Sequence, residues 1–294
     1  MNISATKIAL KAYVESFPAG AVGNFGRTFG TFFADDATIN VVHPFNTITG
    51  EAAYRERFLE PLSAAFDHLA RTDYIAFGGE YEGGQWTTCT GYYSGHFVRP
   101  WLGIAPTGTI AHLRFGEFHR MEGVRAAESY IFLDIPELMI AAGQWPITDS
   151  PGRDRGFTGY LPGPATGDGL QWHDNDPTKG LSSYQLTTDM LQRLATKNEA
   201  WRPYWHKDMR WYGPAAFGSF VGLDNFAAFQ VPFEQTFSEW IGGAMPGSET
   251  GHFTRFADGD YICSGGWPSL NAVQTKQFLG QAPSGKRLFM RVCD

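Results

Sequence analysis

Apolar side chains recur every three or four residues in three segments of the chain. This spacing predicts helices over residues 5–16, 51–69 and 182–196, because it gathers the apolar side chains on one face of each. The clearest stripe belongs to the second segment and begins at Tyr54 and Phe58. Each helix is therefore expected to pack one side against a core.

Strands are expected mainly after the second of these helices. The strand-like segments cover residues 38–42, 86–100, 109–119 and 124–133. The turn at Glu122-Gly123 separates the last two and indicates a hairpin. A short helix should follow over 135–142, since Pro136 is favoured at a first helical position. Helices followed by a run of long strands are typical of an α+β domain with helices packed on one face of a curved antiparallel sheet.

One seven-residue segment occurs twice in the chain. Residues 102–108 read LGIAPTG and residues 279–285 read LGQAPSG, so five of the seven positions are identical. Other matches recur at offsets that differ by a few residues, as loop insertions and deletions produce. The repeated unit has the size of a whole domain rather than of a solenoid motif. The pattern therefore predicts two tandem copies of one α+β domain.

The repeat and the composition together suggest domain boundaries. The first domain is expected over 1–143 and the second over 183–294. Between them, residues 144–182 are rich in Gly and Pro and form the expected linker. The second copy is expected to be incomplete at its C-terminus, because nothing in it corresponds to residues 128–134 of the first.

Charge and cysteine content narrow the classes of function. The formal net charge is −7 and Lys and Arg do not cluster, which disfavours partners rich in phosphate, such as nucleic acids and anionic membranes. No apolar stretch is long enough to span a bilayer. Cys89 and Cys263 fall at equivalent positions of the repeat, so we expect them to be apart and reduced, as in a cytoplasmic protein.

One predicted strand combines carboxylates with aromatic rings. Alternation along the strand that ends at Asp134 places this side chain on one face with Glu128, Tyr130 and Phe132. A carboxylate among rings has a raised pKa, which suits general acid or base catalysis near neutral pH. Glu117 on the preceding strand is a further pocket candidate. The alternatives are that Glu128 is solvated and that Asp134 only caps the following helix.

The histidines offer a proton-transfer partner but no metal motif. His96 lies in an aromatic neighbourhood with Tyr92 and Trp101, and His43 is a weaker candidate. A structural hydrogen-bonding role for His96 is equally compatible with this pattern. The chain has no Gly-rich phosphate loop, no Gly-x-Ser-x-Gly elbow and no helical zinc spacing. We therefore expect neither a metal nor another cofactor.

Three motifs give the first half a family resemblance. Residues 95–108 (GHFVRPWLGIAPTG), 117–123 (EFHRMEG) and 128–134 (ESYIFLD) resemble those of the SnoaL-like polyketide cyclases, which share the cone-shaped fold of nuclear transport factor 2. The resemblance covers most of residues 20–143 and, more weakly, the second copy. It implies cofactor-independent chemistry on a hydrophobic, oxygenated small molecule. Asp134 would then move a proton next to a carbonyl while His96 orients or polarises the substrate oxygen.

The second copy departs from this resemblance. Residues 267–273 (WPSLNAV) stand where His96 would be, so this copy is expected to be non-catalytic. It would serve as an internal pseudo-dimer partner, and the whole chain could also form a homodimer. The rival interpretation is a small-molecule-binding or assembly protein whose pocket no longer catalyses, because this fold hosts many unrelated functions.

Overall fold

The computed structural model describes residues 3–17, 31–147, 168–242 and 251–294. These residues divide into two compact units, which we describe separately. Unit 1 holds the described residues up to Trp145 together with 168–176, and unit 2 holds 146–147 and the described residues from Pro177 onward. Both are mixed α+β structures with curved, largely antiparallel sheets. None of the described helices has both the length and the apolar character needed to cross a membrane.

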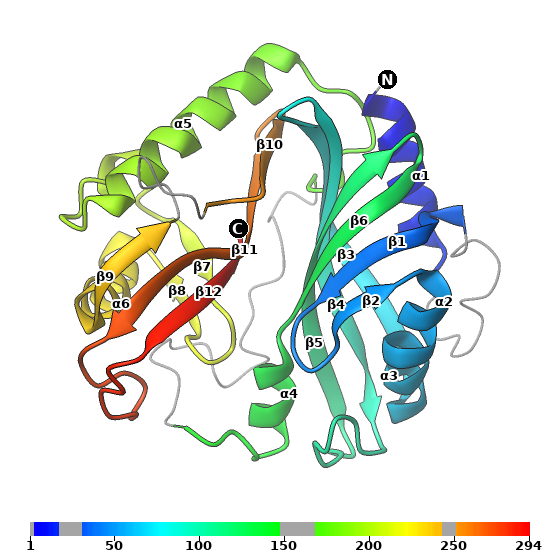
Figure 1. Ribbon diagram of the computed structural model, residues 1–294, viewed down its shortest axis with the longest axis horizontal. Coiled ribbons are helices and arrows are strands. Elements are labelled where there is room, and N and C mark those ends of the chain that lie inside the picture. The colour runs from blue at the N-terminus through cyan, green and yellow to red at the C-terminus, as the bar shows by residue number, and fades with distance from the viewer. Residues whose placement is uncertain (1–2, 18–30, 148–167, 243–250) are drawn as a thin grey trace. The chain divides into compact units, whose positions relative to one another are not determined.

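Unit 1 is built on a six-stranded sheet in the order β2-β1-β6-β5-β4-β3 (Figure 1). Its strands are β1 (Phe33–Val41), β2 (Asn46–Thr49), β3 (Phe66–Tyr81), β4 (Gly84–Phe97), β5 (Ile110–Glu122) and β6 (Arg125–Leu133). Neighbouring strands are antiparallel except β1 and β6, which are parallel. Strand β6 therefore joins the short β1–β2 hairpin to the long strands β3 to β5.

Helices cover one face of this sheet (Figure 1). They are α1 (Ile3–Glu15), α2 (Glu51–Tyr54) and α3 (Glu60–Ala65), with a π-helical turn η2 (Arg55–Leu59) between the last two; α4 (Ile135–Ala141) follows β6. Their apolar stripes meet the inward side chains of the strands in one core. Leu10 of α1, Phe58 of η2 and Leu62 of α3 are fully buried there. The expected helix-on-sheet arrangement is thus present in unit 1.

Strand β3 is the main departure from the sequence-based expectation. The helix expected over 51–69 ends at Ala65, and β3 starts at the next residue. Within β3, His68 adopts a φ of 55°, and the pairing with β4 shifts register both before Ala70 and before Ile75. Because each irregularity resets the alternation of inward and outward side chains, a period-two pattern does not run along this strand.

Unit 2 has a smaller and more aromatic interior. Its elements are α5 (Pro177–Ala195), η3 (Arg202–Tyr204), β7 (Arg210–Tyr212), β8 (Ser219–Val221), α6 (Leu223–Thr236), β9 (Phe237–Gly242), β10 (Thr254–Asp258), β11 (Tyr261–Gln274) and β12 (Arg287–Cys293). Strand β11 pairs with β9, β10 and β12, while β7 and β8 form a separate hairpin. Trp201, Phe226 and Phe229 lie at the centre of the core.

The repeated seven-residue segment adopts the same turn in both units. Leu102 and Leu279 have φ angles of 52° and 47°, and the glycines that follow them have 78° and 75°. Each turn is closed by an isolated bridge, Trp101 with Ile104 in unit 1 and Phe278 with Gln281 in unit 2. The two similar sequences therefore adopt similar backbone conformations.

The segment expected as a linker, 144–182, is divided between the two units. Its middle, 148–167, lies outside the described residues. Residues 168–176 extend the edge of β3, because Leu170 forms a parallel bridge with Ala76. Helix α5 then begins at Pro177, earlier than the helix expected from residue 182.

The close approach of β3 and β4 generates a testable prediction. A Cβ atom at Gly91 would lie 2.0 Å from the carbonyl oxygen of Thr72 and 2.8 Å from the Cα of Asp73. We expect Gly91→Ala to lower the free energy of unfolding by roughly 1–3 kcal/mol, as overpacking does. Thr72→Ala, at an exposed position of the facing strand, is the control and should change stability by about 0.5 kcal/mol or less. Equal urea midpoints for the two variants would contradict this account.

Candidate functional site

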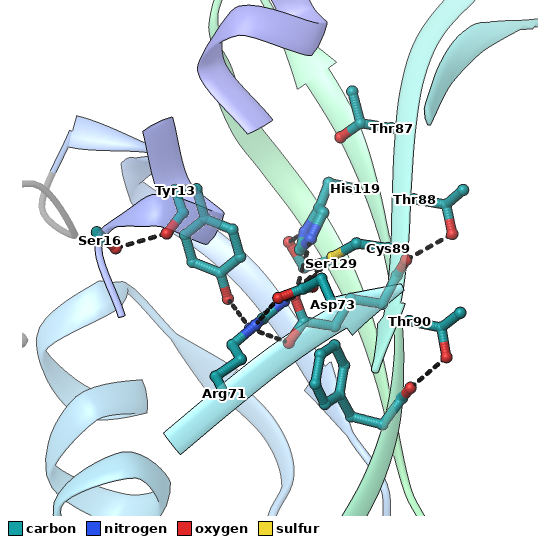
Figure 2. A network of polar contacts seen from close by, with 12 residues as sticks. Tyr13, Ser16, Arg71, Asp73, Thr87, Thr88, Cys89, Thr90, His119 and Ser129 are labelled. Carbon is teal, nitrogen blue, oxygen red and sulfur yellow. Dashed lines mark hydrogen bonds and ion pairs between the residues drawn. The ribbon is translucent and has the colours of Figure 1, made fainter. Parts of the chain in front are cut away.

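The interior of unit 1 contains an ion pair that is almost completely buried. Arg71 of β3 reaches across β4 to Glu117 of β5, and its Nη1 and Nη2 atoms donate to Oε1 at 2.9 Å and to Oε2 at 3.2 Å (Figure 2). The two side chains are 1% and 0% exposed. Such a two-pronged contact fixes the plane of the carboxylate as well as its position.

A second carboxylate holds the other edge of the guanidinium. Asp73 accepts hydrogen bonds from Nε of Arg71 at 2.9 Å and from Nη2 at 2.8 Å. Arg71 and Asp73 are two residues apart on one strand, so both point to the helix-covered face. Arg71 therefore bridges two carboxylates, Asp73 on its own strand and Glu117 two strands away.

Aromatic rings enclose the guanidinium. Its Cζ atom lies 4.1 Å from the ring centre of Phe115, 4.6 Å from that of Phe17, 5.1 Å from Tyr13 and 5.7 Å from Tyr93. Nη1 also donates to the hydroxyl oxygen of Tyr93 at 3.2 Å. Rings of this kind attract a cation through their faces and exclude water from it.

His119 and Cys89 complete the network beside Glu117. The register of the sheet pairs Cys89 with Glu117, and His119 follows two residues later on the same face. Nε2 of His119 lies 3.3 Å from Oε2 of Glu117, and Nδ1 lies 2.9 Å from the hydroxyl of Ser129 on β6. The Cys89 thiol donates to Oε2 at 3.4 Å. Cys89, Glu117 and His119 are also the residues in the described part of the chain that could hold a metal ion.

Burial and neighbouring charges together shift the pKa values of these groups. Burial by itself raises the pKa of Glu117, but Arg71, assisted by His119, lowers this pKa to about 2. Burial raises the pKa of the Tyr93 hydroxyl far above its usual value, and burial and Glu117 do the same to the pKa of the Cys89 thiol. At neutral pH the carboxylate is thus ionised, whereas the phenol and the thiol keep their protons.

Of the pocket residues expected from sequence, Glu117 alone belongs to this network. Glu128, Tyr130 and Phe132 lie on the opposite face of the sheet, because β6 alternates and Ser129 and Ile131 point inward. There Glu128 accepts hydrogen bonds from Tyr130 at 2.7 Å and from Arg120 at 3.3 Å.

The structure does not bring Asp134 and His96 together. Asp134 stands opposite Arg114 of β5, and His96 pairs with Ile110, four residues further along that strand. They are therefore separated by about 13 Å along the strands alone. Asp134 is buried, with Oδ2 lying 3.7 Å from Nη2 of Arg114, whereas His96 is exposed.

The other expected pocket residues also lie away from the network. His43 is exposed beyond the end of β1. Tyr92 is half-buried on the outer face of β4, with its ring near His112. Trp101 is buried in the core, packed against Phe45 and Phe58.

Asp134 stands at the N-cap position of α4 but its side chain makes no capping hydrogen bond there. It lies instead near Arg114 and Glu137. Oε2 of Glu137 accepts the backbone N–H of Arg114 at 3.2 Å, and burial together with Asp134 raises the pKa of Glu137. Asp134 is therefore not a simple helix cap. It belongs to a second small cluster of ionisable side chains, with Arg114 and Glu137.

Sequence reasoning missed Arg71, Asp73, Tyr13 and Tyr93. Tyr13 of α1, Arg71 of β3 and Tyr93 of β4 show no common local pattern, because they belong to separate elements and meet only in the folded unit. The signal that was present is Arg-x-Asp, a cation and a carboxylate at strand spacing within FDHLARTDYIAF. It would have required β3 to be recognised as a strand.

Among its described residues, unit 2 has no buried cation like Arg71. Gly242 stands five residues after the first residue of β9, as Arg71 does after the first residue of β3. Aromatic rings dominate this core instead, with Phe220 and Phe229 stacked at 5.1 Å. The two units therefore differ most in the interior, where unit 1 has its charges.

About half of this chain is similar in structure to several solved proteins. AclR from Streptomyces galilaeus, provisionally named a hydroxylase, matches 50% of this chain and 90% of its own at 14% identity and a TM-score of 0.40. A provisionally named SnoaL-like polyketide cyclase from Jannaschia sp. CCS1 matches 50% of this chain and 96% of its own, at 16% identity and a TM-score of 0.39. A provisionally named polyketide cyclase from Xanthomonas campestris matches 48% of this chain and 99% of its own, at 17% identity and a TM-score of 0.40. Neither a protein-family model nor a curated protein matches the sequence.

The depressed pKa of Glu117 predicts a pH dependence of stability. A carboxyl group whose pKa is lower in the folded state stabilises the fold above its unfolded pKa, near 4.5, and this contribution disappears as the pH falls towards 2. The contribution is on the order of 3 kcal/mol, since each pKa unit corresponds to about 1.4 kcal/mol. We expect the stability difference between the wild type and Glu117→Gln to shrink over this interval in urea titrations. A difference that is the same at pH 5 and pH 2.5 would contradict it.

Proposed function

We propose that unit 1 is an acid/base enzyme of the SnoaL-like type, acting on a hydrophobic, oxygenated small molecule. The reaction would be a cyclisation, isomerisation or lyase step that begins with removal of a proton next to a carbonyl group. We place the reacting groups in the Arg71–Glu117–His119 network and not at Asp134 and His96. The observation that carries this assignment is the buried imidazole of His119 beside an ionised carboxylate.

His119 is the proton acceptor in this proposal. Its Nδ1 faces Ser129 at 2.9 Å, so a hydrogen on Nδ1 can be donated to that hydroxyl. In that tautomer Nε2 carries a lone pair, in place of the hydrogen that it donates to Glu117 in the other tautomer. Oε2 of Glu117, 3.3 Å away, stabilises the imidazolium once Nε2 has taken the proton.

Tyr93 supplies the second half of the chemistry. Its oxygen accepts a hydrogen bond from Arg71, which leaves its own hydrogen for a substrate oxygen. Because burial keeps the phenol protonated, it can stabilise the negative enolate oxygen that forms when the carbon next to the carbonyl group loses a proton. Arg71 keeps Glu117 ionised and oriented.

A purely structural role explains the network less well. Removing charged groups from water costs several kcal/mol for each ion, and well-packed apolar side chains often stabilise a core as much or more. Unit 2 makes its core from aromatic rings without this cation. Strongly shifted pKa values gathered around a desolvated charge are typical of functional sites.

Asp134 is the alternative reacting group. Its burial and the elevated pKa of the adjacent Glu137 give a pair of carboxyl groups that could differ in protonation. The resemblance to SnoaL-like cyclases also favours Asp134. If the reaction occurs there, the Arg71 network positions the fold and does not touch the substrate.

We further infer that the units are tandem copies of one domain and that unit 2 is non-catalytic. The identical turns at 102–108 and 279–285 support a common origin. Gly242 at the position of Arg71 supports the loss of the reacting centre. Unit 2 would then act as an internal partner for unit 1. The alternative function of the chain is small-molecule binding without turnover.

Proton transfer can be tested without knowing the natural substrate. We expect the wild type to catalyse exchange of the α-hydrogens of 2-tetralone, a flat ketone, in D₂O, followed by proton NMR. His119→Gln should slow this exchange by about 10²- to 10⁴-fold, because it removes the base. Tyr93→Phe keeps the ring and should slow it by about 10²- to 10³-fold, through loss of the donor to the oxygen.

Matched variants on the outer face of the sheet serve as controls. Glu128→Gln and His96→Gln should leave the exchange rate unchanged, since neither side chain reaches the network. If Asp134→Asn abolishes exchange while His119→Gln does not, the reacting centre lies at the end of β6. Binding of the ketone with no exchange above buffer, in a folded wild type, would favour the binding protein.

A further inference from the structure

We propose that Cys89, Glu117 and His119 form a binding site for a divalent transition-metal ion of the zinc class. Thiolate, carboxylate and imidazole are the donors that such ions take in proteins. The three donor atoms lie within 4.8 Å of one another, and all three residues are buried. This site goes beyond the proposed acid/base function and does not depend on it.

The sheet itself sets the arrangement of the donors. Cys89 and Glu117 are direct partners across β4 and β5, and His119 is the next inward residue on β5. All three side chains therefore leave a rigid surface on one face and converge without any loop. A site carried on strands holds its ligands more closely than one carried on loops.

The distances between donors match tetrahedral coordination. With metal–sulfur bonds of about 2.3 Å and metal–nitrogen or metal–oxygen bonds of about 2.0 to 2.1 Å, donors at tetrahedral angles lie about 3.3 to 3.6 Å apart. Here Sγ of Cys89 is 3.4 Å and Nε2 of His119 is 3.3 Å from Oε2 of Glu117. An ion can therefore be accepted with only small side-chain adjustments along these two edges.

The surrounding groups orient the donors as metal sites require. Ser129 faces Nδ1 of His119, which leaves Nε2 to bind the ion, and such partners set the tautomer of metal-bound histidines. Nη1 of Arg71 holds Oε1 of Glu117 at 2.9 Å, so Oε2 can face the ion. Nη2, 3.2 Å from both Oε2 and Sγ, must release Oε2 when the ion binds, while its contact with Asp73 keeps the guanidinium in place.

Charge balance favours the ion. Asp73 and Glu117 carry two negative charges against the single positive charge of Arg71, so the buried cluster has an excess of one negative charge when His119 is neutral. When a divalent ion binds, the thiol of Cys89 loses its proton to solvent and a sulfur–metal bond forms. The two positive charges then compensate the excess carboxylate and the new thiolate, and the cluster becomes neutral.

Metal occupancy has a direct consequence for proton transfer. The ion binds through the lone pair of Nε2 on His119, the same atom that accepts the proton in the proposed reaction. An occupied site therefore cannot abstract a proton there, and the ion acts as an inhibitor. This consequence rests on the proposed function, whereas binding of the ion itself does not.

Cobalt(II) titration of the reduced full-length chain tests the site. We expect one Co²⁺ per chain, the visible bands of a tetrahedral ion and a near-ultraviolet sulfur-to-cobalt charge-transfer band. In weakly buffered solution one proton should be released per ion bound, and below the thiol pKa the apparent affinity should rise about tenfold per pH unit. Zn²⁺ should displace the cobalt and bleach the bands.

Three variants make the result specific. Cys89→Ser should abolish the charge-transfer band and weaken Co²⁺ binding at least tenfold, and His119→Gln should weaken it similarly while the protein stays folded by near-ultraviolet circular dichroism. Cys263→Ser removes the corresponding buried thiol of unit 2 and should change neither property. A folded wild type that binds no Co²⁺, or a band that persists in Cys89→Ser and vanishes in Cys263→Ser, overturns the proposal.

Discussion

The charge of Arg71, held away from water, is the constraint on which the interior of unit 1 depends. A guanidinium that is 1% exposed must recover its lost hydration from the protein. Two carboxylates and several ring faces provide this compensation. Tyr13 comes from α1 and Phe17 follows that helix, while the other groups belong to β3, β4 and β5. The cation thereby links the helix layer to the sheet. The bulged strand that carries it is also the element whose sequence looks least like a strand.

The same constraint organises the chemistry around it. Arg71 keeps Glu117 ionised inside a core, and that carboxylate in turn faces an imidazole and a thiol. In our two proposals, proton transfer and metal binding are alternative uses of one set of atoms. Both depend on the lone pair of His119, and both follow from placing negative charge where water does not compete for it.

The two units share local backbone features but have different interiors. They share the turn conformation of residues 102–108 and 279–285, and each runs directly from a helix into a strand, at Phe66 and at Phe237. Backbone geometry of this kind depends on local sequence. The interiors differ, because the hydrophobic core of unit 2 is built on aromatic rings, whereas unit 1 buries the Arg71–Glu117 ion pair.

The sequence by itself determined the features that depend on neighbours along the chain. The helix period, the strands that became β4, β5 and β6, and the mixed α+β class follow from the spacing of apolar residues. Only the tertiary structure decided which polar residues meet. Alternation predicted that Glu128 and Asp134 share one face of a strand, yet the strand ends at Leu133. It also did not say which face the helices cover, and that face belongs to Glu117 and His119. Arg71 joined them because β3 is irregular and lies two strands from β5, a relation that no spacing in the sequence encodes.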